Sequence, residues 1–328
     1  MNHEIMKAIL EKIKAYDRIM LFRHIRIDGD CVGSTKGLKA IIQATWPEKE
    51  VLIVDDETSD YLAFLGPDDA QVADEIYKDA LGIVLDTAST SRISNQKYSL
   101  CKELIKIDHH IPVENYGDLI WVEEKVCSAS ELIVKFYDTF RDELIFTPEA
   151  AYFLYTGMVT DSGRFKYHGV DGDTLRRAAI LLDQGIDIDT LYANLYMEDF
   201  SALKFKAYVY EKIQLTENGV AYVYIDKDMQ EKFHLTREEA SASVDFMDKI
   251  RNTLCWLAFV DSGDENGSIR VRLRSRFMSI NHIAEQFNGG GHACASGATV
   301  YSQEEMLELI SKADTAIKEY KETHEGWL

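Results

Sequence analysis

The sequence has no long hydrophobic run, few prolines and no segment rich in serine and glycine. None of its apolar stretches approaches the roughly 18 residues that a membrane-spanning helix needs, so no contact with a membrane is expected. Residues 1–17, MNHEIMKAILEKIKAYD, are typical of an amphipathic helix and lack the apolar core of a secretion signal. With four prolines and no flexible linker, the connection between domains is predicted to be short or helical, and the protein is expected in the cytoplasm.

Cysteines and positive charge are also scarce. The five cysteines are scattered and form no CxxC pair, which argues against a zinc ribbon and a disulfide framework. The formal net charge of −20 argues against a protein that binds duplex DNA through a broad basic face. It leaves open a small phosphate ligand that is held by a local basic patch or by cations. The 328 residues, of which 46% are hydrophobic, suit two packed globular domains.

Short apolar runs in the first half predict buried strands that alternate with helices. The runs lie at 18–24, 51–55, 81–86 and 103–108, and a helix-like stretch lies at 33–44. Helical periodicity then dominates from residue 130 to about residue 194. This alternation is typical of an α/β fold with a parallel sheet and helices on both faces.

The second half of the chain predicts a smaller α/β domain with a mixed sheet. Two hairpins are expected at 213–225 and 255–275, the first of them around an Asn-Gly turn. A helix near 279–287, which a glycine cluster follows, and a C-terminal helix near 303–321 complete this half. We place the domain boundary so that one domain spans residues 1–195 and the other spans residues 196–328.

Acidic and imidazole side chains follow three of the predicted strands and one predicted helix. They are His24, Asp28 and Asp30 after the first strand, Asp86 after the third, Asp108, His109 and His110 after the fourth, and Asp161 near the end of a helix. Ligands of open parallel sheets bind beyond the carboxyl ends of the strands, so these side chains are expected to meet in one crevice. Gathering so many carboxylates is costly unless cations neutralise them, and two divalent ions about 3.5–4 Å apart would do so. Taken singly, each motif is also typical of an ordinary turn or helix cap.

Five motifs in this order resemble the DHH phosphoesterases, a family named after its Asp-His-His triplet. The motifs are HIRIDGDCVGS, VLDTAS, IDHH, VTDSGRF and NGGGHACASGA, and the resemblance covers about residues 18–300. Order and length are most similar to the short branch of oligoribonucleases (nanoRNases) that also dephosphorylate 3′-phosphoadenosine 5′-phosphate. The resemblance implies a catalytic, metal-binding first domain and a second domain that binds substrate through its GGGH motif.

The resemblance also implies roles for single residues. The first metal ion would be bound by His24, Asp28 and Asp86, and the second by Asp30, Asp86, His109 and Asp161. Asp108 would orient a ligating imidazole, and His110 would face the scissile phosphate as an electrostatic or acid group. The family commonly uses manganese, so two Mn²⁺ ions are expected, with Mg²⁺, Co²⁺ and Zn²⁺ as alternatives. The departures from the family pattern, which remove no proposed ligand, are Ile27, Asn288, Cys294 and Ser296.

An arginine row and a glycine cluster predict an anion site in the second domain. With the period of a strand, one face carries Arg270, Arg272, Arg274 and Arg276, and the other carries Ile269, Val271 and Leu273. Guanidinium groups bind phosphate in a bidentate manner. The glycines of the GGGH motif are expected to open a helix whose backbone N–H groups hold an anion. Taken alone, the arginine row is also typical of an exposed strand face, and the glycines are typical of a loop. The resemblance implies substrate contacts by Arg274, Ser275, Gly289, Gly290, Gly291 and His292.

Together these expectations describe a metal-dependent phosphodiesterase and phosphatase. A metal-bridged hydroxide would attack phosphorus, releasing 5′-mononucleotides from short single-stranded RNA and AMP from 3′-phosphoadenosine 5′-phosphate. The alternatives are a phosphodiesterase of cyclic or linear dinucleotides, an inorganic pyrophosphatase, which the GGGH motif disfavours, and a non-catalytic nucleotide-binding regulator. A homodimer is left open. No role is expected for His168, His234 and His282, and the acidic run at 55–57 is expected to be solvated.

Overall fold

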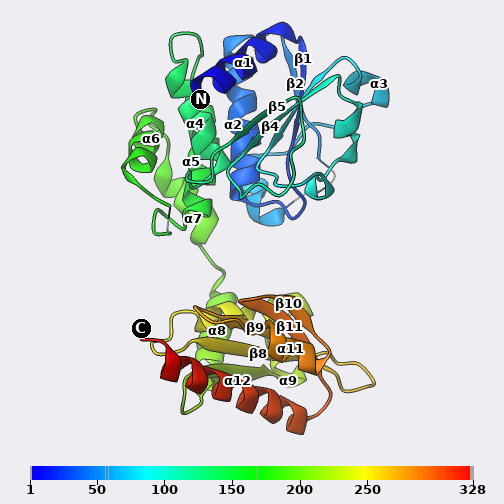
Figure 1. Cartoon of the computed structure of the whole chain (residues 1–328), viewed down its shortest axis with the longest axis vertical. Coiled ribbons are helices and arrows are strands. Elements are labelled where there is room, and N and C mark those ends of the chain that lie inside the picture. Colours follow the sequence, from blue (N-terminus) through cyan, green and yellow to red (C-terminus); the bar gives the residue numbers. More distant parts are fainter. Residues whose placement is uncertain (1, 56, 58, 168, 326–328) are drawn as a thin grey trace. The chain divides into compact units, whose positions relative to one another are not determined.

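The computed structural model describes residues 2–55, 57, 59–167 and 169–325, so Asp56 and His168 lie outside the described residues. The chain divides into two compact units, Met1–Met197 and Glu198–Leu328, each with its own sheet (Figure 1). Within the described residues, none of the helices has the length and apolar character that crossing a membrane requires.

The first unit is built on a five-stranded sheet in which every neighbouring pair of strands is parallel. Its strands, in the order β2-β1-β3-β4-β5, are β2 (Glu50–Ile53), β1 (Arg18–Phe22), β3 (Leu81–Leu85), β4 (Glu103–Asp108) and β5 (Leu119–Val122). The parallel α/β sheet and four of its strands are confirmed. Strand β5, a short strand at the edge of the sheet, was not predicted from the sequence.

Helices cover both faces of this sheet. They are α1 (Asn2–Ala15), α2 (Gly29–Thr45), α3 (Asp74–Tyr77), α4 (Ala129–Thr139), α5 (Pro148–Asp161), α6 (Gly172–Leu182) and α7 (Ile188–Tyr196). Alternate residues of β1 supply the two cores: Ile19 and Leu21 join the large core with α1, α2, α4 and α5, whereas Met20 and Phe22 join a smaller core with α3.

The start of α2 differs from the prediction in a way that matters for the site. The helix begins at Gly29, four residues before the expected position, because the Asp28 side chain caps it by accepting from the backbone N–H groups of Asp30 and Cys31. Helices α2 and α5 then pack backbone against backbone. A Cβ on Gly33 would lie 2.5 Å from the carbonyl oxygen of Phe153, so only glycine fits there.

The second unit has a six-stranded mixed sheet in the order β10-β11-β9-β8-β7-β6. Its strands are β6 (Gln214–Leu215), β7 (Val220–Ile225), β8 (Cys255–Asp261), β9 (Ile269–Ser275), β10 (Gly290–His292) and β11 (Ala295–Val300). Both predicted hairpins, β6–β7 and β8–β9, are antiparallel pairs, and β7 and β8 are parallel to each other. The helices are α8 (Phe200–Lys212), α9 (Lys227–Phe233), α10 (Arg237–Ala242), α11 (Asn281–Ala284) and α12 (Gln303–Thr323).

Two expectations about local structure are wrong. The GGGH motif opens no helix: Gly290–His292 is strand β10, which pairs antiparallel with β11. A Cβ on Gly289 would lie 2.1 Å from the carbonyl oxygen of Gly297, so part of the glycine requirement is the close approach of these strands. The acidic run at 55–57 is not uniformly solvated, because the side chain of Asp55 is 2% exposed and forms an ion pair with the buried Arg23.

Candidate active site

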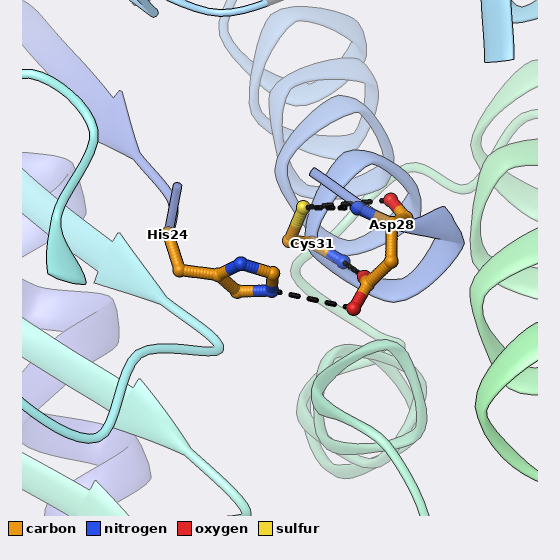
Figure 2. A group of neighbouring side chains, drawn as sticks. All are labelled: His24, Asp28 and Cys31. Carbon is orange, nitrogen blue, oxygen red and sulfur yellow. Dashed lines mark hydrogen bonds and ion pairs between the residues drawn. The ribbon is translucent and has the colours of Figure 1, made fainter. Parts of the chain in front are cut away.

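The first group of predicted ligands gathers at the carboxyl end of β1. His24 follows the strand, Asp28 caps α2, and Asp86 follows β3 directly (Figure 2 shows His24 and Asp28). His24 Nε2 lies 3.4 Å from Asp28 Oδ2 and 3.3 Å from Asp86 Oδ2. On the other side of the ring, Nδ1 lies 2.7 Å from the carbonyl oxygen of Ile25, which can only accept, so this nitrogen carries the proton and Nε2 is left to ligate.

The second group of predicted ligands meets around His109. The His109 Nε2 atom lies 3.2 Å from Asp86 Oδ1, 3.4 Å from Asp161 Oδ2 and 3.9 Å from Asp30 Oδ2. Its Nδ1 atom lies 3.2 Å from the carbonyl oxygen of Val126, which again leaves Nε2 for a ligand. Asp86 thus touches both groups, through Oδ2 on one side and Oδ1 on the other. The structure brings all six predicted metal ligands together.

The fold fixes the orientation of Asp30 through a distant helix. The Asp30 side chain is fully buried, and its two oxygens accept from the backbone N–H groups of Ala129 at 2.6 Å and Ser130 at 2.8 Å, at the first turn of α4. A helix N-terminus stabilises negative charge, so α4 both aims this carboxylate and favours its ionised form. This contact was not predicted, since nothing in the sequence pairs residues that are about a hundred positions apart.

Electrostatics show that the centre carries surplus negative charge. Burial, together with the neighbouring carboxylates Asp86 and Asp161, raises the pKa of Asp30 well above its ordinary value. Burial also raises the pKa of Asp161 to about 6, which the charge of His109 only partly opposes. Burial alone would lower the pKa of His109, but Asp86 and Asp30 outweigh it and raise that pKa to about 10.

A cation would relieve this charge, and the donor atoms fit one. Asp86 is 2% exposed, and its Oδ1 accepts no hydrogen bond from any of the described residues. Three sets of three donor atoms each lie within 4.8 Å of one another. They come from His24, Asp28 and Cys31, from Asp30, His109 and Asp161, and from Asp86, His109 and His110. Imidazole and carboxylate donors are the ligands that divalent transition metals accept in proteins.

The Asp-His-His triplet differs from expectation in one detail. Asp108 was expected to orient a ligating imidazole, but its Oδ1 lies 2.8 Å from Nδ1 of His110, which is not among the predicted ligands. The reason is that His109 turns toward Asp86 and Val126 instead. Asp108 is fully buried, and the Nζ atom of the buried Lys106 lies 3.4 Å from its Oδ2. Asp108 therefore fixes the ring of His110 and leaves the Nε2 of that ring for a ligand.

One side chain of the first group was not among the predicted ligands. The Sγ atom of Cys31 lies beside His24 and Asp28, because Cys31 occupies the third position of α2 and faces back toward the cap (Figure 2). The sequence spacing could have indicated this side chain. Residues three apart at the start of a helix lie on the same side of it, so Cys31 lies beside Asp28.

In the second unit the arginine row lies on one face of β9, as expected. Arg270, Arg272 and Arg274 alternate with buried apolar residues, while Arg276 follows the end of the strand. Arg270 and Arg272 line a cavity of about 840 Å³ together with Arg237. Arg270 also donates to Thr299 Oγ1 at 2.8 Å.

The remaining predicted substrate contacts divide into two groups. His292 pairs with Ala295 of β11, and Ala295 pairs with Arg274 of β9, so the exposed His292 and the half-buried Arg274 flank the same strand. Ser275 points to the opposite face: it is 8% exposed and donates its hydroxyl to the Met278 carbonyl at 2.6 Å. The Ser275 side chain is therefore occupied by the protein itself.

Comparisons with known proteins agree with the motifs. The family model described as the DHH family, N-terminal domain, matches residues 18–158, and the DHHA1 domain model matches residues 217–319. A "Bifunctional oligoribonuclease and PAP phosphatase NrnA" of Bacillus subtilis (strain 168) is 38% identical over 314 residues, which cover 95% of this chain and 99% of the relative. A "Probable bifunctional oligoribonuclease and PAP phosphatase NrnA" of Streptococcus mutans is 39% identical over 95% of this chain and 99% of the relative. The crystal structure of an exopolyphosphatase-related protein from Bacteroides fragilis superimposes with a TM-score of 0.80 at 26% identity, over 98% of this chain and 97% of the other.

Proposed function

This chain belongs to the DHH family of metal-dependent phosphoesterases, and we propose that it hydrolyses short oligoribonucleotides to 5′-mononucleotides and 3′-phosphoadenosine 5′-phosphate to AMP. The support for this substrate class is the near full-length similarity to relatives named as oligoribonucleases and PAP phosphatases. The support for the chemistry is the convergence of six ligands from distant segments, with Asp86 between the two groups. We assign the catalytic role to the first unit and substrate binding to the second.

Two divalent cations fit the donor atoms, and we expect Mn²⁺ at both positions. His24, Asp28 and Asp86 would hold the first ion, and Asp30, Asp86, His109 and Asp161 would hold the second. When bound, divalent ions lower the pKa of water and offset the charge of a phosphate group, so they would make hydroxide available closer to neutral pH. Imidazole donors suit manganese better than magnesium, which prefers oxygen ligands and water.

Other groups of each unit are proposed to contact the substrate. Asp108 holds the ring of His110 through Nδ1, so the Nε2 atom is available to a phosphate oxygen. The exposed arginines of β9 and His292 would bind the distal nucleotide, and this binding would fix the position of the substrate. Ser275 is left out of this set because its hydroxyl is bonded to the Met278 carbonyl.

A substrate panel tests the proposal. The full-length protein with Mn²⁺ is assayed against a ladder of short RNAs, 3′-phosphoadenosine 5′-phosphate, cyclic diadenylate and pyrophosphate. We expect 5′-mononucleotides from the shortest RNAs and AMP from the bisphosphate, with turnover abolished by a chelator. Hydrolysis of cyclic diadenylate or pyrophosphate in preference to both would contradict the proposed substrate class but not the metal centre.

A further inference from the structure

A thiol lies within the first group of metal ligands. The Sγ atom of Cys31 and one donor atom each from His24 and Asp28 all lie within 4.8 Å of one another (Figure 2). Donor atoms that share one transition-metal ion at about 2.0–2.3 Å are themselves about 3–4.5 Å apart. Cys31 is fully buried, so its sulfur faces the interior beside these two ligands and not the solvent.

The sulfur is only weakly engaged by the protein. It accepts from the backbone N–H of Asp28 at 3.3 Å and lies 3.4 Å from the carbonyl oxygen of the same residue. It also interacts with the imidazole of His24, the side chain whose Nε2 atom is left to ligate. These contacts hold the sulfur beside the proposed ligand atoms of the first ion. Because hydrogen bonds to sulfur are weak, the sulfur remains available to a metal ion.

A second observation points to a cation at the same place. The carboxylate of Asp86 is 2% exposed, and its Oδ2 lies 3.3 Å from His24 Nε2, while Asp28 Oδ2 lies 3.4 Å from the same nitrogen. Two carboxylates gathered around one buried imidazole nitrogen are costly to keep ionised, and a bound ion removes that cost.

We propose that Cys31 is an additional protein ligand of the first metal ion and binds it as a thiolate, whose proton is released to solvent on ligation. This inference rests on the proposed two-ion function and deepens it. The first ion would then have nitrogen, oxygen and sulfur donors, whereas the second has only nitrogen and oxygen donors. Because thiolates prefer soft ions, the first position would favour Zn²⁺, Co²⁺ or Cd²⁺ over Mg²⁺, and more so than the second.

The replacement Cys31→Ser separates ligation from folding. A serine hydroxyl is close in size to the thiol and still accepts from the Asp28 N–H, so the capping box at the start of α2 is preserved. Cys101→Ser and Cys294→Ser are matched controls, because neither Cys101 nor Cys294 belongs to a group of potential metal ligands among the described residues.

The full-length protein and each variant are loaded with Co²⁺ and examined by absorption spectroscopy. Visible d–d bands report cobalt bound by any ligands, and a near-ultraviolet band reports sulfur-to-cobalt charge transfer. We expect both features in the unmodified protein and in the two controls, and loss of the near-ultraviolet band alone in Cys31→Ser. Competitive titration should show a loss of at least about 10-fold in the preference for Cd²⁺ over Mn²⁺ in that variant, since even outer ligand contacts change metal affinity about 10–100-fold.

The outcomes separate this inference from the proposed function. Visible bands without a near-ultraviolet band in the unmodified protein would overturn Cys31 as a ligand and leave the two-ion centre standing. A near-ultraviolet band that persists in Cys31→Ser would do the same. If no cobalt binds at all, both the ligand assignment and the proposed metal centre are overturned.

Discussion

Replacing Asp86 with asparagine perturbs the one side chain that both ligand groups share. Its Oδ2 lies 3.3 Å from His24 Nε2, and its Oδ1 lies 3.2 Å from His109 Nε2. An amide has the same shape but only one oxygen, so it can serve one ion at most. The backbone tolerates the change: Asp86 has a φ of 55°, and asparagine is among the residues that adopt this left-handed region most readily.

The magnitude of the loss follows from what the bridge does. Changing an outer contact of a metal ligand typically costs about 10–100-fold in affinity or activity, so loss of a shared ligand should cost at least about 100-fold in kcat, or roughly 2.7 kcal/mol of barrier. The thermal stability of the metal-free variant should not fall in the same way as its activity. Without metal, the variant loses the repulsion of Asp86 against Asp30 and Asp161 but also its attraction for His24 and His109, so its Tm should change little.

Thermal unfolding with and without Mn²⁺ completes the assay. An ion present at about 100 times its Kd stabilises the folded state by about 2.7 kcal/mol. For a unit of this size, that corresponds to a rise in Tm of roughly 5–10 °C. We expect the rise in the unmodified protein and most of it to be lost in Asp86→Asn. A variant that keeps both near-normal turnover and the full rise in Tm would refute the bridging role.

Three further changes test other parts of the site. In Gly157→Ala, the new Cβ would lie 2.0 Å from Ser130 Oγ and 2.9 Å from Asp30 Oδ1, so metal affinity measured by calorimetry should fall as Asp30 is displaced. In Asp108→Asn, kcat should fall about 10–100-fold because the partner of the His110 ring loses its negative charge, while bound metal measured by elemental analysis should stay constant. In Arg274→Ala, the KM for a diribonucleotide should rise about 10-fold or more through loss of a charged hydrogen bond, with metal content unchanged, whereas the exposed Arg176→Ala should leave KM as it was.

The sequence allowed much of the first unit to be predicted, because its signals are local. Strands buried on both faces appear as continuous apolar runs, and β1, β3 and β4 lie within the runs that were expected. A parallel sheet places the ends of its strands at one edge, so His24, Asp86 and Asp108 could be expected to meet there. The short strand β5 was missed because its four residues, Leu119–Val122, give too brief a pattern to stand out.

What could not be predicted depends on contacts between distant residues or on competition between local structures. The orientation of Asp30 depends on backbone N–H groups of α4, and no local sequence pattern predicts such a contact. The GGGH motif could have opened a helix or joined a strand, and its pairing with β11 decided the outcome. Ser275 resembles a substrate contact in sequence, but the alternation of β9 turns it toward the core.

The backbone sets the tautomers of the two imidazoles that are proposed as ligands. Nδ1 of His24 and Nδ1 of His109 face the carbonyl oxygens of Ile25 and Val126, and a carbonyl neither donates a proton nor titrates. Each Nε2 is thus the nitrogen that faces the proposed ion, and it can ligate once it has lost its proton. The segment around Val126 would therefore be part of the proposed metal centre even though its contact is through the backbone, and a change in its backbone path should weaken binding of the second ion.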